Sequence, residues 1–399
     1  MTDLSTDFTR TRAAFHLPSG VTYLDGNSLG PMPVAARDRV AAMMQDEWAQ
    51  MLIRGWNEAG WYAQPRVTGD RIARLIGAGD GQVVMGDTLS IKVFQAVSAA
   101  RALRPGRRVI LSDSGNFPSD LYVVQGLARA IDSDLRVVEP EAVAEAIDDD
   151  LAVLMLTEVD YRTGRRHDMA ALTAAAHDAG ALTVWDLAHS AGAVDVDLLG
   201  ADADFAVGCT YKYLNGGPGA PAFIWTHPRH ADAAQPILQG WMGHAAPFAF
   251  QPDYEPAGGV ERMRVGTPPV IALAALDAAL DVWDHVAMPD LRARSIELTE
   301  AFIAQVEASC PDLTLNSPRD PARRGSQVSF RHPQAYAVMQ ALIAQGVIGD
   351  FRAPDVLRFG FAPLYNTAED VSRAVGIMAR ILREGSWDRQ EYHARAAVT

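Results

Sequence analysis

The sequence predicts an α/β protein with a mainly parallel sheet, joined to a smaller α+β domain. Apolar, β-branched runs recur through the middle of the chain, as expected of strands that are buried on both faces. Helical patterns separate several of these runs, which is typical of parallel strands joined by crossover helices. The 399 residues also exceed what one compact core usually holds, so we expect one large and one smaller domain.

The large domain is expected to begin near residue 70. An amphipathic helix over 35–51 precedes it and follows the turn-rich DGNSLGPMP at 25–33. The strands of the large domain are expected at 107–113, 151–157, 181–186, 204–210 and 221–227. The helices between and before them are expected at 91–103, 119–130 and 169–180.

The pattern changes at about residue 270. Long helices are expected at 270–284, 289–308 and 367–383, around short strands at 327–332 and 356–361. The sequence therefore divides into an N-terminal segment (1–69) that packs with the small domain, a large α/β domain (70–270) and a small α+β domain (271–399).

Composition excludes several classes of function. The net charge of −14 and the pI of about 5.1 disfavour a nucleic-acid partner, because no basic stripe offsets them. No apolar run reaches the roughly 20 residues that span a bilayer. The polar opening has no secretory signal, and the only two cysteines, Cys209 and Cys310, exclude a disulfide framework and a cysteine-based zinc site. We expect a cytoplasmic protein without a membrane partner or a metal.

The scarcity of lysine narrows the chemistry. Only two of the 35 basic residues are lysines, Lys92 and Lys212. Arginine stays protonated and cannot form an imine, so these two are the only side chains able to hold a carbonyl cofactor covalently. Lys92 lies in a helical pattern, SIKVFQAV, and is expected to face solvent or to extend its ammonium along the helix to reach it. Lys212 follows an apolar strand, where a purely structural ammonium would be costly to bury.

An acid stands at the end of the preceding strand. Asp186 closes ALTVW, and Lys212 lies in CTYKYLNGGPG after the next strand. Alone, Asp186 would be read as a turn or helix-capping residue. Together the pair suits pyridoxal phosphate (PLP), whose pyridine nitrogen needs a carboxylate and whose aldehyde needs a lysine. Ser119 and Asp120, which begin a helix, and the TLS turn at 88–90 could hold the cofactor ring and phosphate.

Nine segments carry a resemblance to a known family. They are YLDGNSLGPMP (23–33), TLS (88–90), FPSD (117–120), YRTG (161–164), DLAHSAG (186–192), YKYLNGGPGAPAF (211–223), GWMGH (240–244), RVGTPP (264–269) and RFGFAPLYN (358–366). On these segments the chain resembles kynureninases over nearly its whole length. The resemblance implies a PLP-dependent transferase-like fold of type I, with a seven-stranded sheet, in a homodimer whose active sites are shared between subunits.

The resemblance also implies the site residues. It makes Lys212 the Schiff-base lysine for pyridoxal 5'-phosphate and Asp186 the partner of the pyridine nitrogen. The other expected cofactor contacts are Leu89, Ser90, Phe117, Ser119, Asp120, Thr157, His189, Tyr211, Trp241 and Thr267. Trp241 and Thr267 would reach the phosphate from the partner subunit. Thr267 departs from the asparagine that is common in the family, but its hydroxyl can still donate a hydrogen bond. Arg358 would bind the substrate carboxylate, with Asn27 and Trp61 also at the substrate.

The implied reaction is the hydrolytic cleavage of the Cβ–Cγ bond of L-kynurenine or 3-hydroxykynurenine. The products would be L-alanine and anthranilate or 3-hydroxyanthranilate. The pathway served would be tryptophan catabolism, NAD biosynthesis or the synthesis of a secondary metabolite. Lys212 would move the proton of Cα, and Tyr211 would either transfer a proton or only bond the phosphate. The alternatives on the same fold are a cysteine desulfurase-like lyase and an aminotransferase, and a further one is a PLP-binding protein without turnover.

Overall fold

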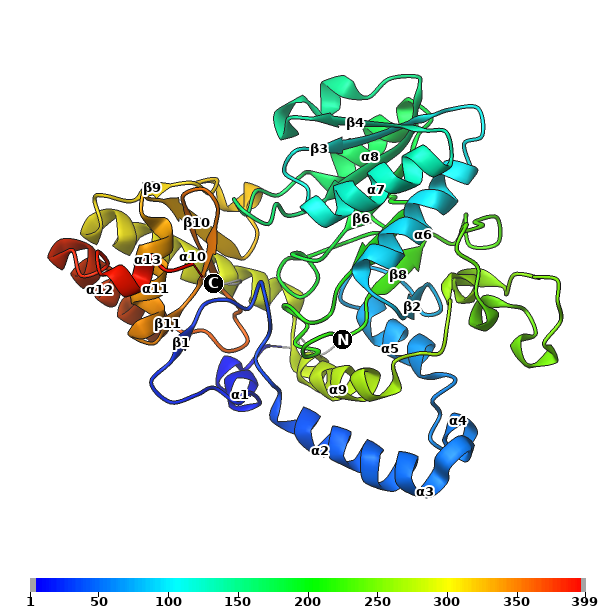
Figure 1. Ribbon diagram of the computed structural model, residues 1–399, viewed down its shortest axis with the longest axis horizontal. Helices are drawn as coiled ribbons and strands as arrows, with labels where there is room; N and C mark the ends of the chain where they lie inside the picture. The colour runs from blue at the N-terminus through cyan, green and yellow to red at the C-terminus, as the bar shows by residue number, and fades with distance from the viewer. Residues whose placement is uncertain (1–4, 396–399) are drawn as a thin grey trace.

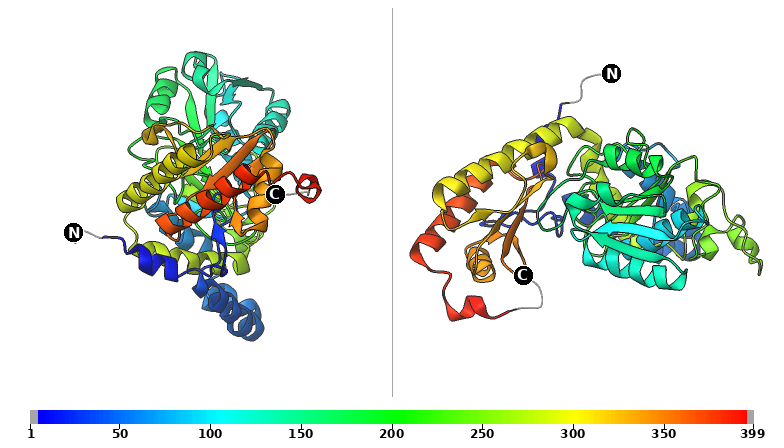
Figure 2. Two further views of the ribbon diagram at one scale, coloured as in Figure 1. Left: turned by 90° about the vertical axis from the view of Figure 1, so that its left-hand side faces the viewer. Right: turned by 90° about the horizontal axis from the view of Figure 1, so that it is seen from above.

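The computed structural model describes residues 5–395. Figure 1 shows two lobes side by side, and the view from above in Figure 2 separates them clearly. We call the lobe around the seven-stranded sheet the large lobe and the lobe around the four-stranded sheet the small lobe. The N-terminal helix α2 (Val34–Ala42) lies beneath the large lobe in Figure 1, next to α9 (Val270–Leu280).

The large lobe is built on a seven-stranded sheet, as the resemblance implies. In order across the sheet its strands are β2 (Val83–Met85), β8 (Phe223–Thr226), β7 (Phe205–Gly208), β6 (Leu182–Asp186), β5 (Leu151–Thr157), β3 (Val109–Asp113) and β4 (Asp134–Val138). All neighbouring pairs are parallel except those that β8 makes with β2 and β7. The prediction of a mainly parallel sheet is confirmed, with β8 as its one antiparallel member.

Helices cover both faces of this sheet, which explains the unbroken apolar runs. Val153 and Met155 of β5 belong to the core beneath α6 (Leu89–Ala102) and α7 (Pro118–Ala130). Leu154 and Leu156 point to the opposite core, which α8 (Met169–Asp178) covers. Because neither face meets water, β5 has no polar side chain before Thr157.

The small lobe has a four-stranded antiparallel sheet. Its strands are ordered β12 (Asp350–Arg352), β13 (Val356–Gly360), β10 (Gln327–Arg331) and β9 (Thr314–Leu315). Its helices are α10 (Met288–Ser309), α11 (Ala335–Ala344), α12 (Ala368–Glu384) and the short α13 (Gln390–His393). Phe302 of α10 packs against three phenylalanines of the sheet region: Phe330, Phe359 and Phe361. This core is separate from those of the large lobe.

The N-terminal segment joins the small lobe through β1 (Thr22–Tyr23), which pairs in parallel with β11 (Val347–Ile348). The helix expected over 35–51 is present but continues from α2 through a π-helical turn (Met43–Trp48) into α3 (Ala49–Met51). The other N-terminal helices are α1 (Phe8–Ala13), α4 (Gly55–Glu58) and α5 (Gln64–Ala73). Short 3₁₀ turns lie at 52–54, 140–142, 144–146, 241–243, 247–249, 259–263, 281–285 and 321–323.

The prediction that Lys92 faces solvent is wrong. Lys92 is fully buried in α6, and its Nζ lies 3.2 Å from Asp87, 2.9 Å from Gln95 Oε1 and 2.8 Å from the backbone oxygen of Met263. The segment that supplies Met263 lies 171 residues further along the chain, so helical spacing alone gave no sign of it.

Among the described residues, no helix is long and apolar enough to cross a bilayer.

Candidate active site

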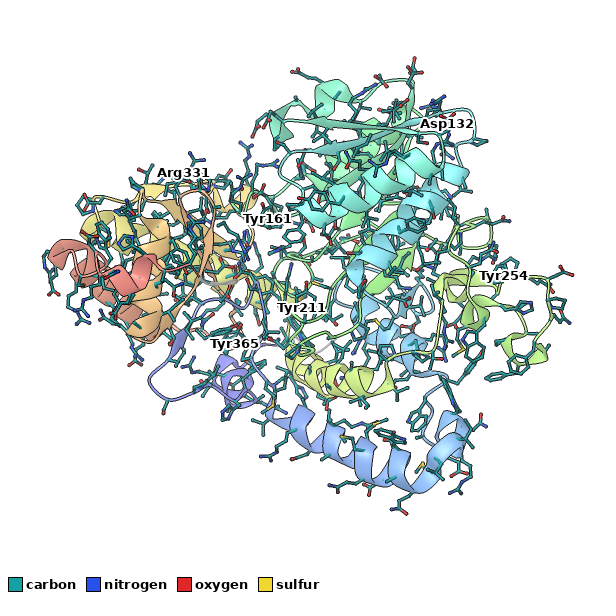
Figure 3. All side chains as sticks on the ribbon, viewed as in Figure 1. Asp132, Tyr161, Tyr211, Tyr254, Arg331 and Tyr365 are labelled. Carbon is teal, nitrogen blue, oxygen red and sulfur yellow. The ribbon has the colours of Figure 1, made fainter. Side chains whose placement is uncertain are left out.

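The carboxyl ends of the central strands open into a cavity of about 240 Å³. Ligands of open α/β sheets bind at this edge, because the loops that follow the strands converge there. The cavity is lined by Thr88, Leu89, Ser90, Phe117, Ser119, Thr157, Tyr161, Asp186, Ala188, His189, Tyr211, Lys212, Gly219 and Ala220. Nine of these are residues that the sequence predicts for the cofactor. Figure 3 labels Tyr161 and Tyr211 between the two lobes.

Lys212 lies in the loop that follows β7. The loop is held from within, because Gly216 N donates to the oxygen of Thr210 and Asn215 N to the oxygen of Lys212. It is also held from outside by the DGNSLG segment, where Gly30 N donates to the oxygen of Tyr211 at 2.8 Å. A Cβ at Gly30 would lie 2.5 Å from the oxygen of Lys212, so only glycine allows this approach. The two motifs thus fix the lysine together.

Two buried carboxyls face the lysine. Asp186 ends β6 and accepts a hydrogen bond from Ala188 N at 2.9 Å, while Asp120 lies in the first turn of α7. Burial raises the pKa of Asp186 to about 6, and the charge of Lys212 opposes the rise. Burial and repulsion by Asp186 raise the pKa of Asp120 well above its usual value. Neither oxygen of Asp120 has a hydrogen-bonding partner, so the pair awaits a donor.

His189 contacts the lysine directly. Its Nε2 lies 2.9 Å from Lys212 Nζ, and its ring is buried. Burial lowers the pKa of His189 well below its usual value, and the nearby charges of Lys212 and Arg358 add to the effect. The imidazole is therefore neutral at physiological pH, so the contact is a hydrogen bond between an amine and a neutral ring.

The start of α6 forms one end of the cavity. Thr88 is the N-cap, and its side chain makes no capping hydrogen bond. Leu89 and Ser90 follow, and the Ser90 hydroxyl lies 3.5 Å from the hydroxyl of Ser119. The free N–H groups of a 14-residue helix and two hydroxyls suit an anion such as phosphate.

Aromatic rings form the walls of the cavity. Phe117 is 40% exposed although it lies beside the buried sheet edge, and its ring meets that of Tyr161 edge-on at 5.1 Å. Lys212 Nζ lies 5.8 Å from the ring centres of both Phe117 and Tyr211. An exposed ring above a lysine and a carboxyl pair suits a planar ligand stacked on Phe117.

The predicted substrate residues lie outside the lining of the cavity. Arg358 on β13 is buried, and its Nε and Nη2 both bond Asp350, whereas Nη2 also donates to Ser28 Oγ. Its Nη1 donates to the backbone oxygen of Tyr161, a residue of the cavity wall. Asn27 is buried beside Arg358's strand, and its Nδ2 donates to Gln327 Oε1.

Three predicted residues are not brought to this cavity within one chain. Trp61 packs with Met43 and Ala274, and its Nε1 donates to Glu47. Trp241 is 37% exposed and lies against Phe248 and Phe250. Thr267 is exposed in a bend before α9.

Sequence reasoning missed several residues of the site. Thr88 and Tyr161 stand within or next to motifs that were recognised, TLS and YRTG, so these motifs signalled them. Ala188, Gly219 and Ala220 line the cavity without a chemically reactive group. Gln327, which bonds His189, comes from the small lobe, and its strand pattern gives no signal of the contact.

The residues present fit PLP. The orphaned buried oxygens of Asp120 next to Asp186 fit a protonated ring nitrogen, and Lys212 fits the aldehyde. The N-terminus of α6 fits the phosphate. Both cysteines are buried, and burial raises the pKa of Cys310 to about 11, so neither offers the accessible thiolate that sulfur transfer needs.

The sequence is similar to those of known kynureninases over nearly its whole length. A family model described as the kynureninase C-terminal domain matches residues 291–378. A kynureninase of Pseudomonas fluorescens is 51% identical over 397 residues, which cover 97% of this chain and 95% of that protein. A kynureninase of Burkholderia pseudomallei is 52% identical with the same coverage.

Solved structures agree on the fold. A cysteine desulfurase of Thermococcus onnurineus has a TM-score of 0.81 at 18% identity, covering 96% of this chain and 100% of that one. A cysteine desulfurase of Escherichia coli has a TM-score of 0.80 at 20% identity, with 95% and 99% covered. A C-DES structure with glycine covalently linked to its PLP cofactor has a TM-score of 0.78 at 17% identity, with 92% and 98% covered. At these identities the likeness concerns the fold alone.

Proposed function

The chain belongs to the kynureninase family, and we propose that Lys212 covalently holds its PLP while L-kynurenine is cleaved hydrolytically between Cβ and Cγ. The protein is a PLP-dependent hydrolase, and its products are anthranilate and L-alanine. The observation that supports the role of Lys212 is its position in one cavity with Asp186 and His189, close to the buried carboxyl of Asp120.

When bound, PLP supplies an electron sink for the bonds that break at Cα and Cβ. Asp186 and Asp120 keep the proton on the ring nitrogen that makes this sink effective. Burial raises the pKa of both carboxyls, and a cationic N–H beside them would favour their charged form. Phe117 holds the ring plane from one face.

Lys212 moves the proton of the substrate. Once its amine is free, Nζ takes the proton from Cα and passes it on within the same cavity. The neutral Nε2 of His189, 2.9 Å away, accepts a hydrogen bond from that amine and so orients it. Proton transfer by a positioned amine of this kind contributes about 10² to 10⁴-fold to a rate.

Tyr211 serves as a hydrogen-bond donor. Burial raises the pKa of its phenol above the usual value, so the hydroxyl keeps its proton at neutral pH. A protonated phenol can donate either to the phosphate or to the developing γ-oxygen of the substrate, and both roles need the same atom.

Arg358 binds the substrate carboxylate with the edge of its guanidinium that Asp350 leaves free. Asp350 occupies Nε and Nη2, so the Nη1–Nη2 edge, now on Tyr161 O and Ser28 Oγ, is the one that can receive a second carboxylate. Asn27 completes the substrate region within the chain. Trp61 packs against Met43 and Ala274, so it could serve the aryl end of the substrate only in the site of a partner subunit.

The enzyme is a cytoplasmic homodimer in which each subunit contributes to the site of the other. Trp241, Phe248 and Phe250 form an exposed aromatic cluster, of which Phe250 is 77% exposed. Exposed apolar patches of this kind mark interfaces. Pairing would place Trp241 and Thr267 of one protomer at the phosphate of the other. Sedimentation velocity tests this, because F250S should shift the protein toward monomer and lower its PLP affinity together.

A direct assay tests the activity. We expect the holoenzyme to release fluorescent anthranilate and an equal amount of L-alanine from L-kynurenine, and comparison with 3-hydroxykynurenine gives the ring preference. Release of alanine from L-cysteine with a sulfide equivalent, without anthranilate from L-kynurenine, would instead assign a desulfurase. Cleavage of neither substrate by PLP-loaded protein would overturn the proposal.

A further inference from the structure

Gln327 connects the small lobe to the lysine pocket. It opens β10, it is 1% exposed, and its amide uses every hydrogen-bonding position. Nε2 donates to the backbone oxygens of Asp160 and Tyr161 at 2.9 and 3.0 Å. Oε1 lies 3.1 Å from His189 Nδ1 and 3.3 Å from Asn27 Nδ2. Four segments far apart in the sequence therefore meet at one amide.

The orientation of this amide has only one solution. Backbone oxygens accept and never donate, so the nitrogen of the amide must face Asp160 and Tyr161. The oxygen is then left facing His189. Because a carbonyl oxygen only accepts, Nδ1 of His189 must carry the proton. The neutral ring has one proton, so Nε2 carries a lone pair.

That lone pair points at the reactive amine. Nζ of Lys212 lies 2.9 Å from Nε2, and as a free amine or ammonium it has a proton to donate. In the opposite tautomer Nδ1 of His189 would carry no proton, and its lone pair would face the acceptor oxygen of Gln327. The two hydrogen bonds therefore run in one direction: Lys212 donates to His189, and His189 donates to Gln327.

We propose that Gln327 is a positioning residue of the reaction, which keeps the proton of His189 on Nδ1 and so leaves Nε2 free to accept a hydrogen bond from Lys212. This inference rests on the proposed role of Lys212. Asn27 belongs to the same hydrogen-bond network, because its amide donates to the same oxygen of Gln327. It also makes the amine's orientation depend on how the small lobe is seated.

The tautomer of His189 can be measured without turnover. Long-range ¹H–¹⁵N NMR of the ¹⁵N-histidine-labelled, PLP-loaded enzyme without substrate, with His189 assigned by H189Q, should show Nδ1 protonated in the wild type. A wild-type His189 protonated on Nε2 would overturn the proposal, whether or not the protein cleaves L-kynurenine. An absence of anthranilate with Nδ1 protonated would count against the proposed function alone.

Two variants then test the role of the amide. Q327M keeps the length but removes the acceptor, so His189 should populate both tautomers, and kcat should fall about 10- to 100-fold with KM changed by less than about threefold. Q327E keeps an acceptor but adds a charge, so it should retain the Nδ1 proton while moving the acidic limb of the kcat profile to higher pH.

A matched control separates this role from packing. Gln340 on α11 has a buried amide nitrogen without a partner, and Q340M should leave both the tautomer and the pH profile unchanged. Wild-type tautomer and pH profile in both Q327M and Q327E would refute the inference.

Discussion

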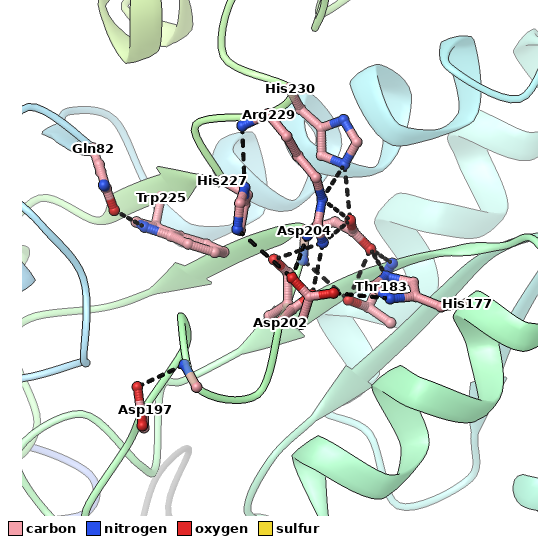
Figure 4. Close-up of polar contacts among 12 residues, drawn as sticks. Gln82, His177, Thr183, Asp197, Asp202, Asp204, Trp225, His227, Arg229 and His230 are labelled. Atoms are coloured by element: carbon pink, nitrogen blue, oxygen red, sulfur yellow. Dashed lines mark hydrogen bonds and ion pairs between the residues drawn. The ribbon is translucent and has the colours of Figure 1, made fainter.

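Two buried aspartates at opposite ends of the same pair of strands have opposite environments. Asp186 ends β6 at the carboxyl edge, and burial raises its pKa to about 6. Asp204 precedes β7 at the other edge, where hydrogen bonds lower its pKa far below the usual value despite the cost of burial. His177, His230, Arg229 and the backbone of Thr183 all donate to it, as Figure 4 shows.

The difference separates a structural carboxylate from a functional one. Asp204 is fully partnered, and its network ties α8 and the segment after β8 to the start of β6 and β7. Within residues 5–395, no group of acidic, histidine or cysteine side chains is arranged to hold a metal, so this cluster is explained by its own contacts. Both oxygens of Asp120 lack a donor, which is costly unless a ligand supplies one, and Asp186 accepts one backbone N–H, that of Ala188. Missing partners in a cavity therefore mark the site better than buried charge does.

The largest effect is expected at the two lysines. K212A should lower kcat by about 10³-fold or more and abolish covalent PLP attachment, because the chain's other lysine, Lys92, is buried in α6. K92M should keep the covalent chromophore but lose about 3 kcal/mol of stability, since it leaves Asp87 without its buried partner. Visible absorbance and urea unfolding distinguish the two. Covalent PLP in K212A would contradict this assignment.

D186N should reduce kcat by about 10² to 10³-fold without destabilising the apoenzyme. The neutral amide in D186N would no longer hold the proton on the nitrogen of the PLP ring. The apoenzyme would lose little stability, because burial already disfavours the charged form of the Asp186 carboxyl. Steady-state kinetics and urea midpoints check both parts. A stability loss as large as the loss of rate would return Asp186 to a structural role.

D204N should do the reverse and cost about 3 kcal/mol of stability, because it breaks a buried charged network from one side. Holoenzyme that remains folded should keep its kcat within about twofold of wild type, since the cluster lies at the far edge of the sheet. Urea unfolding and kinetics at low temperature provide the measurement. A selective loss of kcat would mean that the two edges are coupled.

A smaller effect is expected in the pH dependence of the apoenzyme's stability, to which the two aspartates contribute with opposite sign. The raised pKa of Asp186 contributes stability that is fully present below 3.8 and is lost as pH rises through about 6. The lowered pKa of Asp204 contributes stability that is present above 3.8 and is lost only in stronger acid. The hydrogen bond to Asp204 raises the pKa of His177, so the stability that His177 contributes is fully present below pH 6.5.

Urea midpoints between about pH 4.5 and 6.5 test these signs. Wild type should lose stability relative to D186N as pH rises across this range, whereas its advantage over D204N should stay constant. Parallel profiles for the two comparisons would show that the environments of the aspartates do not differ as described.

The sequence predicted the structure correctly where the pattern of a single strand or helix was enough to define it. β5 is Leu151–Thr157 as predicted, because both of its faces are apolar and its ends are polar. Asp186 and Lys212 were found because a polar residue after a buried strand must lie at the ligand edge. β4, with exposed side chains, and the two-residue strands β9 and β11 lack such patterns and were not predicted.

Contacts between segments that are far apart in the sequence could not be predicted from it. Lys92 looked solvent-facing because its cover comes from the segment around Met263. Gln327 looked like an ordinary strand residue because its partners lie 138 to 300 positions away. The division into three segments at 69 and 270 stays a prediction, as do the individual roles at the site.

Borohydride reduction of the PLP-loaded enzyme, followed by peptide mapping, tests most directly whether the unpartnered edge of the sheet is the cofactor site. The chain has two lysines, so there are only two possible side-chain positions for the reduced adduct. We expect one PLP per chain, on Lys212, with Lys92 unmodified. An adduct on Lys92, or no covalent adduct in protein that binds PLP, would contradict the account.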